Sequence, residues 1–368
     1  MPPSILRLSD GGDSNVTLQA PFTVLTTSKK RKRPPMIEIP NVLQEIESSA
    51  AKFTPENCES RSDGVFSSSG FGVGVCSVKG RKSFMEDAHT IVSSSNADKG
   101  FFGVYDGHGG SKAAEFVAKN LHSNVFEMLD KCSENTTTEE VVKAAFIKTD
   151  DEFLKQGLES GTCCVTALIK GKDLVVSNLG DCRAVLSRKG KVETLTKDHR
   201  ASHEDERKRI EDKGGYVELH RGTWRVHGIL AVSRSIGDAH LKDWVVGEPE
   251  TKVLPLTKDL EYLVLASDGL WDEVGNQEAI DVVTRCMLPP KVKKVYRMKQ
   301  TVKNNRKGNE NEEPRPKVKT KTPNQNQNSE PGPGTGLVEA CKELVNLGVS
   351  KGSLDDITVM IVDLKAFQ

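Results

Sequence analysis

Several aspartates in this sequence stand where short apolar runs stop, and no other feature constrains its folding as strongly. Three such runs each lead into one aspartate: 101–105 into Asp106, 174–178 into Asp181 and 262–266 into Asp268. Asp355 and Asp356 directly precede a fourth run, and Glu86 and Asp87 lie in another such break. Because strands of one sheet end along a shared rim, the pattern predicts carboxylates gathered at one place.

Short apolar runs joined by tight turns are typical of antiparallel strands. The runs concerned are 163–169, 174–178 and 183–187. Apolar residues three or four positions apart predict helices elsewhere in the chain. The helical stretches are 117–128, with Ser111 as a candidate cap, 279–286, and 337–347, which a strand at 357–362 follows. The mixture predicts an α+β fold.

Clustered carboxylates repel one another unless cations lie among them. Oxygen ligands favour Mg²⁺ or Mn²⁺ over zinc. Any single aspartate of this kind is more often a turn residue than a ligand, and Glu86 with Asp87 alone would suit a solvated face. The whole set, however, favours a metal site. His108 lies two residues after Asp106 in a glycine-rich loop, which makes it a candidate acid or base as well as an ordinary surface or core histidine.

The composition divides the chain into one folded region and two polar stretches. Residues 1–70 are rich in Ser, Pro, Thr and charge without periodicity, which predicts a mostly disordered N-terminal extension. Residues 291–336 are rich in Lys, Asn, Gln and Pro, which predicts a flexible insertion. Because apolar patterning resumes afterwards, the sequence predicts one domain over 71–365 that this insertion interrupts.

The charge distribution argues against a nucleic-acid binder. The formal net charge is zero, yet residues 291–330 carry 12 Lys and Arg against 4 Asp and Glu, and residues 1–70 carry eight of each sign, so the rest is acidic. No apolar stretch approaches the roughly 20 residues of a membrane span, and the first residues lack the order of a signal peptide. The eight cysteines form no C-x-x-C pair and are expected to be reduced. A soluble, monomeric intracellular protein is expected.

Six motifs resemble, in order, those of the type 2C protein phosphatase family. They are KSFMED at 82–87, VYDGHGG at 104–110, NLGDCR at 178–183, AVSRSIGD at 231–238, ASDGLWD at 266–272 and SLDDITV at 353–359. The order and spacing fit from about residue 71 to residue 365, with one extra insertion. Six motifs in order are far more specific than any single one.

The resemblance implies a four-layer α-β-β-α sandwich, in which two antiparallel sheets pack face to face with helices outside each. It also implies two bridged Mg²⁺ or Mn²⁺ ions bound by Asp106, the Gly107 carbonyl, Asp268 and Asp355. Asp181 matches the position of a weaker third ion, shared with Asp268. Metal-bound waters would be held by two more carboxylates, Glu86 and Asp87.

The same resemblance implies a mechanism for hydrolysing phosphoserine and phosphothreonine. A metal-bridged hydroxide, available near neutral pH, would attack phosphorus in line. His108 would protonate the departing Ser or Thr oxygen. Residues from about 199 to 242 match a flap that shapes substrate preference.

Two positions depart from the family's pattern. The family usually places an arginine four residues before the motif glutamate, whereas this chain has Lys82 there and Arg81 one residue earlier. Lysine supplies charge but no bidentate clamp, so either phosphate binding is weaker or Arg81 reaches in. Asp356 stands where many members have asparagine. This extra carboxylate would either tune the metals or be a neutral variation of the plant type.

A basic cluster near the N-terminus is followed by two aliphatic residues. The residues are Lys29, Lys30, Arg31, Lys32, Arg33, Ile37 and Ile39. The arrangement resembles the docking motif of mitogen-activated protein kinase partners, and also a nuclear localisation signal. A basic stretch in a disordered tail is the plain alternative. We expect a location in the nucleus and cytoplasm. The overall arrangement resembles the plant stress-signalling branch of the family.

Together these features predict a metal-dependent protein serine/threonine phosphatase that acts on a docked mitogen-activated protein kinase. A pseudophosphatase that binds phosphoproteins without hydrolysing them is the rival from another class, favoured only by Lys82. A small-molecule phosphatase is disfavoured by the docking-like tail.

Overall fold

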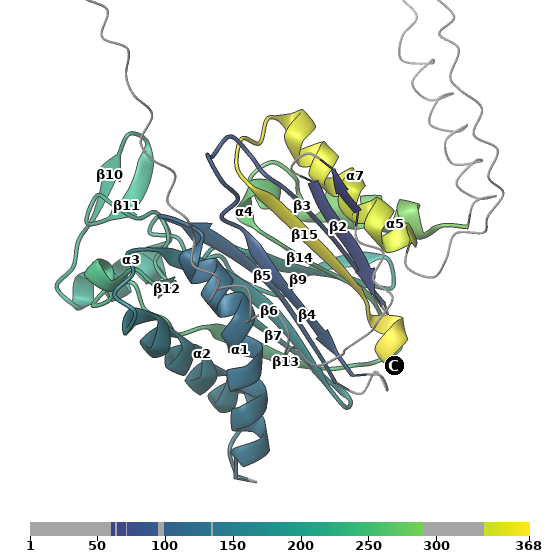
Figure 1. The fold of residues 1–368 in the computed structure, drawn as a ribbon, viewed down its shortest axis with the longest axis horizontal. Helices are drawn as coiled ribbons and strands as arrows, with labels where there is room; N and C mark the ends of the chain where they lie inside the picture. The colour runs from purple at the N-terminus through teal and green to yellow at the C-terminus, as the bar shows by residue number, and fades with distance from the viewer. Residues whose placement is uncertain (1–59, 63–64, 71, 95–98, 134, 290–334) are drawn as a thin grey trace, which may run out of the picture. The chain divides into compact units, whose positions relative to one another are not determined.

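The computed structural model describes residues 60–62, 65–70, 72–94, 99–133, 135–289 and 335–368 (Figure 1). The N-terminal docking-like motif and almost all of the predicted insertion lie outside these residues. In the described part, the strands form two large sheets and one separate hairpin, and every strand pair is antiparallel, as the tight turns predict.

The first sheet has seven strands in the order β1-β2-β3-β15-β14-β8-β9. Their bounds are β1 Ser60–Ser62, β2 Val65–Gly70, β3 Val73–Val78, β8 Arg183–Arg188, β9 Lys191–Thr194, β14 Leu260–Ala266 and β15 Ile357–Asp363. Strands from both ends of the chain meet here, because β15 lies between β3 and β14.

The second sheet runs in the order β13-β7-β6-β5-β4, and the short strand β12 pairs with β6. The bounds are β4 Ala88–Ser93, β5 Lys99–His108, β6 Gly161–Lys170, β7 Asp173–Leu179, β12 Ile236–Gly237 and β13 Glu250–Pro255. The apolar side chains of its central strands are buried on both faces, because they belong to a core shared with the first sheet and to a second core shared with helices.

Two helical layers enclose the paired sheets (Figure 1). Helices α1 (Lys112–Lys131) and α2 (Thr138–Leu154) cover the second sheet, while α4 (Asp268–Trp271), α5 (Asn276–Met287) and α7 (Thr335–Lys351) cover the first. The structure also contains two 3₁₀ helices, η3 (Ala239–Leu241) and η4 (Leu364–Phe367). The result is the predicted four-layer α-β-β-α sandwich.

Alternation along β5 shows why each sheet is buried on both faces. Phe102 and Val104 belong to the core between the sheets, whereas Phe101 and Tyr105 pack under α1 and α2. Successive strand residues point to opposite faces, so a strand buried on both sides reads as the continuous apolar run seen in the sequence.

Helix α2 has no counterpart among the predicted elements. Its start is marked by a capping box, in which the Thr137 hydroxyl accepts from the Glu140 N–H and the Glu140 side chain accepts from the Thr137 N–H. Such a box satisfies two backbone donors that a helix start leaves free. A threonine followed three residues later by a glutamate was the available sequence signal.

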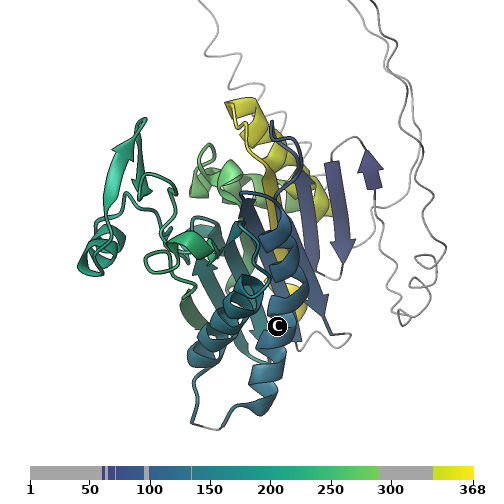
Figure 2. The ribbon, with the colours of Figure 1, turned by 60° about the vertical axis from the view of Figure 1, so that its left-hand side comes forward.

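Residues between β9 and β13 form a flap with its own small core. It contains α3 (Glu204–Asp212) and the hairpin β10 (Val217–His220) and β11 (Thr223–Val226). Its buried apolar residues are Ala201, Ile210, Val226, Leu241 and Val245. In both ribbon views the β10–β11 hairpin stands apart from the two large sheets (Figures 1 and 2).

Ordered elements reach past two of the predicted bounds. Strands β1 and β2 fall inside the stretch 1–70 predicted as an extension, since a serine-rich edge strand pairs through its backbone and shows no apolar alternation. Helix α7 begins at Thr335, two residues inside the predicted insertion 291–336, and runs to Lys351 rather than ending at residue 347. No helix in the described part is both long and apolar enough to cross a membrane.

Candidate active site

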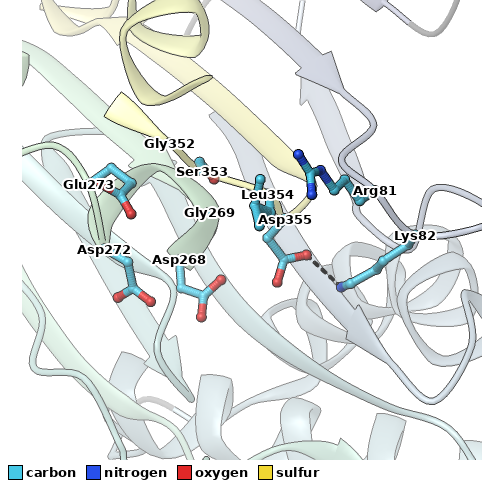
Figure 3. Close-up of a pocket in the computed structure, with 10 residues that line it drawn as sticks. All are labelled: Arg81, Lys82, Asp268, Gly269, Asp272, Glu273, Gly352, Ser353, Leu354 and Asp355. Atoms are coloured by element: carbon cyan, nitrogen blue, oxygen red, sulfur yellow. Dashed lines mark ion pairs between the residues drawn. The ribbon is translucent and has the colours of Figure 1, made fainter. Parts of the chain in front are cut away.

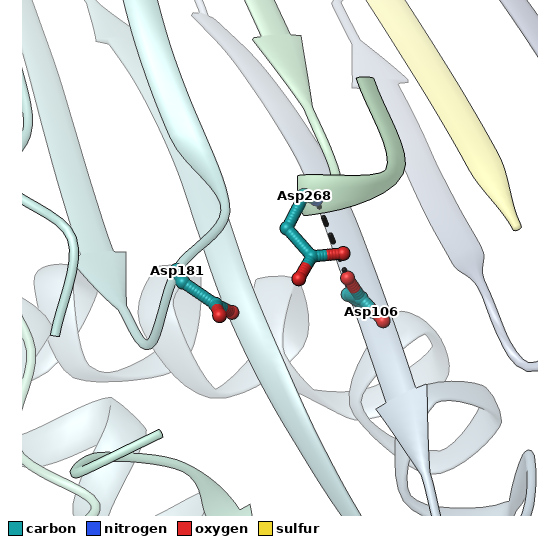
Figure 4. Close-up of side chains that lie close together, drawn as sticks. All are labelled: Asp106, Asp181 and Asp268. Carbon is teal, nitrogen blue, oxygen red and sulfur yellow. Dashed lines mark hydrogen bonds between the residues drawn. The ribbon is translucent and has the colours of Figure 1, made fainter. Parts of the chain in front are cut away.

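Three aspartates from both sheets meet at one place (Figure 4). Asp106 lies on β5, Asp181 follows β7, and Asp268 is the first residue of α4 after β14. One carboxylate oxygen of each lies within 4.8 Å of the others. The structure therefore gathers these three carboxylates, as their positions along the chain predict.

Strand β5 is longer than predicted, and Asp106 lies within it. The strand expected at 101–105 continues to His108, because β6 extends far enough to pair Asp106 with Cys163 and His108 with Gly161. Asp106 is thus held by a sheet ladder and not by a turn.

Burial makes the gathered carboxylates electrostatically costly. It raises the pKa of Asp106 well above the usual range, and the charges of Asp87, Asp268 and Asp181 raise that pKa further. The pKa values of Asp181 and Asp268 are also raised, chiefly by burial, and burial raises the pKa of Asp87 to about 7. A cation among these groups would reverse the cost by favouring their charged forms.

The donor atoms fit a hard divalent cation. Among the described residues, this cluster offers carboxylate oxygens without histidine or cysteine ligands. Such oxygen sets suit Mg²⁺ or Mn²⁺.

The other predicted carboxylates, Glu86, Asp87 and Asp355, lie outside the three-aspartate cluster and have partners of their own. Ser267 Oγ donates to Oδ2 of Asp87 over 2.8 Å. The buried Glu86 accepts the Gly110 N–H at Oε1 over 2.7 Å, and Lys82 at Oε2 over 3.1 Å. Asp355 lies on the same groove as Asp268 but outside the three-aspartate cluster, with Oδ1 held 2.7 Å from Lys82 Nζ (Figure 3).

Gly107 permits a close approach of two backbone segments. A Cβ atom there would lie 2.4 Å from the carbonyl oxygen of Glu86, a distance that real side chains do not tolerate. The segment carrying Glu86 and Asp87 can therefore reach the strand that carries Asp106 only because residue 107 is glycine.

Lys82 and Arg81 occupy one side of the groove (Figure 3). Burial alone would lower the pKa of Lys82, but its hydrogen bonds to Asp355 and Glu86 raise that pKa, so the ammonium stays charged. Arg81 is exposed and lines the same groove, and its backbone N–H donates to the Leu354 carbonyl over 2.8 Å. Both cations thus remain candidates for holding phosphate.

His108 has a buried carboxylate partner that sequence reasoning missed. Its Nε2 atom lies 2.7 Å from Oδ2 of Asp238. Burial would raise the pKa of Asp238, but hydrogen bonds with His108 and Ser235 and the charge of Lys242 hold it below the usual value. Asp238 was visible only as the last residue of the motif at 231–238, and nothing local pairs it with His108.

The approach of His108 and Asp238 depends on Gly161. A Cβ atom at residue 161 would lie 2.1 Å from Asp238 Oδ2 and 2.3 Å from His108 Nε2. Asp238 itself has a φ of 52°, in the left-handed region that few residues other than glycine adopt. The strained backbone aims its carboxylate at the histidine.

Arg200, at the base of the flap, also reaches the aspartate cluster. It forms ion pairs with Asp181, Asp268 and Asp272 at 3.1, 3.3 and 2.8 Å. Neither Arg200 nor Asp272 was predicted as a site residue. Asp272 lies four residues after Asp268, one helical turn away, and this spacing was the only local signal for it.

Asp356 holds the loop that carries the phosphate-binding candidates. Its Oδ1 accepts the Gly80 N–H over 2.7 Å, and its Oδ2 accepts the Glu86 N–H over 2.8 Å. The extra carboxylate is therefore occupied by backbone donors and fixes both ends of the loop between Gly80 and Glu86.

A cluster of carboxylates suited to divalent cations on a four-layer sandwich is the arrangement expected of a metal-dependent hydrolase, and comparisons identify the family. Residues 71–304 match the family model described as protein phosphatase 2C. Among curated relatives, probable protein phosphatase 2C 14 of Arabidopsis thaliana is 47% identical over 334 residues, covering 83% of this chain and 75% of the relative. Probable protein phosphatase 2C 25 of the same plant is 42% identical, covering 98% and 80%.

Solved structures share the fold at low sequence identity. A Caenorhabditis elegans sex-determining protein has a TM-score of 0.63 at 21% identity, covering 82% of this chain and 68% of its own. The serine-threonine phosphatase 2C of Toxoplasma gondii has a TM-score of 0.56 at 22% identity, covering 84% and 99%. The chain belongs to the protein phosphatase 2C family, a metal-dependent family, and is a protein serine/threonine phosphatase of the plant type.

Proposed function

We propose that this chain hydrolyses phosphoserine and phosphothreonine at the groove lined by Lys82, Arg81 and Asp268, the last of which belongs to the three-aspartate cluster. The observation that carries the proposal is the convergence of Asp106, Asp181 and Asp268 from two sheets within 4.8 Å. A cluster of buried anions beside two cations suits a phosphate ester together with divalent metals.

Two Mg²⁺ or Mn²⁺ ions are the proposed cofactors, with a third bound more weakly. Asp106, the Gly107 carbonyl, Asp268 and Asp355 would hold the pair, and Asp181 would share the third ion with Asp268. When bound, such ions supply a water of lowered pKa and neutralise charge on phosphoryl oxygens. Glu86 and Asp87 would accept hydrogen bonds from the waters around them.

The chain's own residues would bind and orient the substrate. Lys82 or Arg81 would hold the phosphate, with Arg81 able to offer two parallel donors. Asp356 would keep Arg81 and Lys82 in place, because it accepts backbone hydrogen bonds from both ends of their loop.

His108 would hold the proton for the leaving oxygen of the Ser or Thr side chain. Asp238 would orient the imidazole through its hydrogen bond with Nε2 of the ring. A histidine paired with a carboxylate is fixed in position and tautomer.

The proposed physiological substrate is a mitogen-activated protein kinase in stress signalling, bound through the N-terminal tail. The support is the order of basic residues at 29–33 followed by Ile37 and Ile39. The same basic run supports a location in the nucleus and cytoplasm. We also propose that 71–365 is the catalytic domain, extended at its start by β1 and β2.

The experiment is hydrolysis of a phosphothreonine peptide by the full chain with Mn²⁺, with EDTA and with fluoride. We expect turnover with Mn²⁺ that EDTA abolishes and that fluoride inhibits. Binding of the peptide without turnover would support the pseudophosphatase instead. Turnover of small phosphate esters with no turnover of phosphopeptides would indicate a small-molecule phosphatase.

A further inference from the structure

Arg200 places a positive charge at one end of the aspartate cluster. Its Nε atom lies 3.1 Å from Oδ2 of Asp181, and one terminal nitrogen lies 3.3 Å from Oδ2 of Asp268 and 2.8 Å from Oδ1 of Asp272. A planar guanidinium can pair with several carboxylates at once. One positive charge is therefore shared among three carboxylates, two of which belong to the cluster.

The backbone of Arg200 belongs to the base of the flap. It forms an isolated bridge with Val232, and the neighbouring Ala201 donates its N–H to the Ala231 carbonyl. Ala201 is also part of the flap's small core. The arginine thus joins a segment with its own packing to carboxylates that stand on both sheets.

A divalent ion and this guanidinium would compete for the same oxygens. Asp181 and Asp268 are two of the three carboxylates whose oxygens lie close enough to share an ion, and both are paired with Arg200. Like charges separated by a few ångströms repel by several kcal/mol at an effective dielectric constant of about 20. An ion shared by Asp181 and Asp268 would therefore have to displace Arg200.

We propose that Arg200 is a positioning residue that ties the flap to the cluster and weakens divalent binding at the Asp181–Asp268 end. Occupancy of that end releases the arginine, so metal concentration controls how firmly the base of the flap is held. The inference rests on the proposed metal-dependent function. It concerns metal affinity and side-chain release, and both can be measured without turnover.

The first test measures Mn²⁺ binding by calorimetry to the full chain and to three variants. Arg200→Gln should raise the affinity of the weakest class of sites by about ten-fold or more, because a nearby like charge is removed. Arg200→Lys keeps the charge and should remain close to the wild type. Lys208→Gln is the matched control, since Lys208 lies on the flap helix α3 and pairs with the exposed Asp212.

An unchanged or lowered affinity in Arg200→Gln would overturn the proposal, and so would an equal rise in Lys208→Gln. A second measurement needs only the wild type, in case Arg200→Gln does not fold. Phenylglyoxal modifies free guanidinium groups, and mass spectrometry locates the product. Saturating Mg²⁺ should raise the labelling of Arg200 relative to Arg183, which pairs with Asp198 outside the cluster.

Labelling of Arg200 that does not respond to Mg²⁺ would contradict its release by metal. Hydrolysis is scored separately with a phosphothreonine peptide. A chain that binds metal and releases Arg200 but does not hydrolyse the peptide would refute the proposed function and leave this inference standing. Turnover without any effect of Arg200 on metal binding would support the proposed function and refute this inference.

Discussion

Nε2 of His108 lies 2.7 Å from Oδ2 of Asp238, although the two residues are 130 positions apart in the chain. Strand β5 supplies the histidine, and the turn after β12 supplies the aspartate. Gly161, between them, leaves room for the contact. The pair gives a histidine of fixed orientation on the strand that also carries Asp106.

Replacing Asp238 with asparagine should lower kcat for a phosphothreonine peptide by about 10- to 100-fold. His108 is the proposed proton donor, and the substitution removes the charged carboxylate that pairs with it. Asparagine adopts the left-handed backbone of residue 238 readily, so the fold should persist. Turnover of p-nitrophenyl phosphate should fall much less, since that leaving group needs no proton. Equal losses on both substrates would argue against this role, and Asp212→Asn on the flap surface is the control.

Asp268→Asn should abolish nearly all hydrolysis while the protein stays folded. The substitution keeps the volume but removes charge from the residue shared by the cluster and Arg200. Residues that merely orient metal ligands cost about 10- to 100-fold when mutated, so a direct ligand should cost at least as much. Steady-state kinetics with near-ultraviolet circular dichroism checks both parts, and wild-type rates would refute the metal assignment.

Lys82→Arg should lower KM for the phosphopeptide by about 2- to 10-fold, because a guanidinium can bind phosphate through two parallel hydrogen bonds. If Arg81 already supplies that grip, Lys82→Arg should change little and Arg81→Ala should raise KM instead. Kinetics of both variants, with Lys131→Ala as an exposed control at the end of α1, separate the two cases. Unchanged KM in both variants would place the phosphate elsewhere.

Deleting residues 291–330 and joining the ends with a short linker should leave peptide hydrolysis nearly unchanged. The described residues that flank this segment are close, since a Cβ on Gly336 would lie 3.2 Å from Sδ of Met287 at the end of α5. Because closing a shorter connection costs less entropy, the deletion should stabilise the fold by on the order of 1 kcal/mol. A large loss of activity or a lower Tm would show that the segment packs on the domain.

Replacing Lys29, Lys30, Arg31, Ile37 and Ile39 with alanine should weaken binding to a mitogen-activated protein kinase and slow its dephosphorylation. Charge pairing with an acidic surface would account for much of the binding, which should therefore weaken with salt. Hydrolysis of a short phosphopeptide should not change. Lost nuclear accumulation with normal dephosphorylation of purified phosphorylated kinase would replace the docking hypothesis by one of nuclear import.

The sequence by itself determined the family, the antiparallel pairing and most of the metal-binding candidates. The apolar runs are local signals, so the gathering of Asp106, Asp181 and Asp268 beside them could be predicted from the sequence. The ordered motifs added the four-layer architecture, which the core between the sheets and the two cores under the helix layers confirm.

Tertiary structure alone decided which side chains face one another at the site. The pairing of His108 with Asp238, of Arg200 with Asp181 and of Lys82 with Asp355 joins residues from distant parts of the chain. No periodicity encodes such contacts, because they depend on how two sheets and a flap pack and not on the conformation of any one segment. For the same reason, the serine-rich β2 escaped detection, since its place beside β3 rests on backbone hydrogen bonds that every sequence can form.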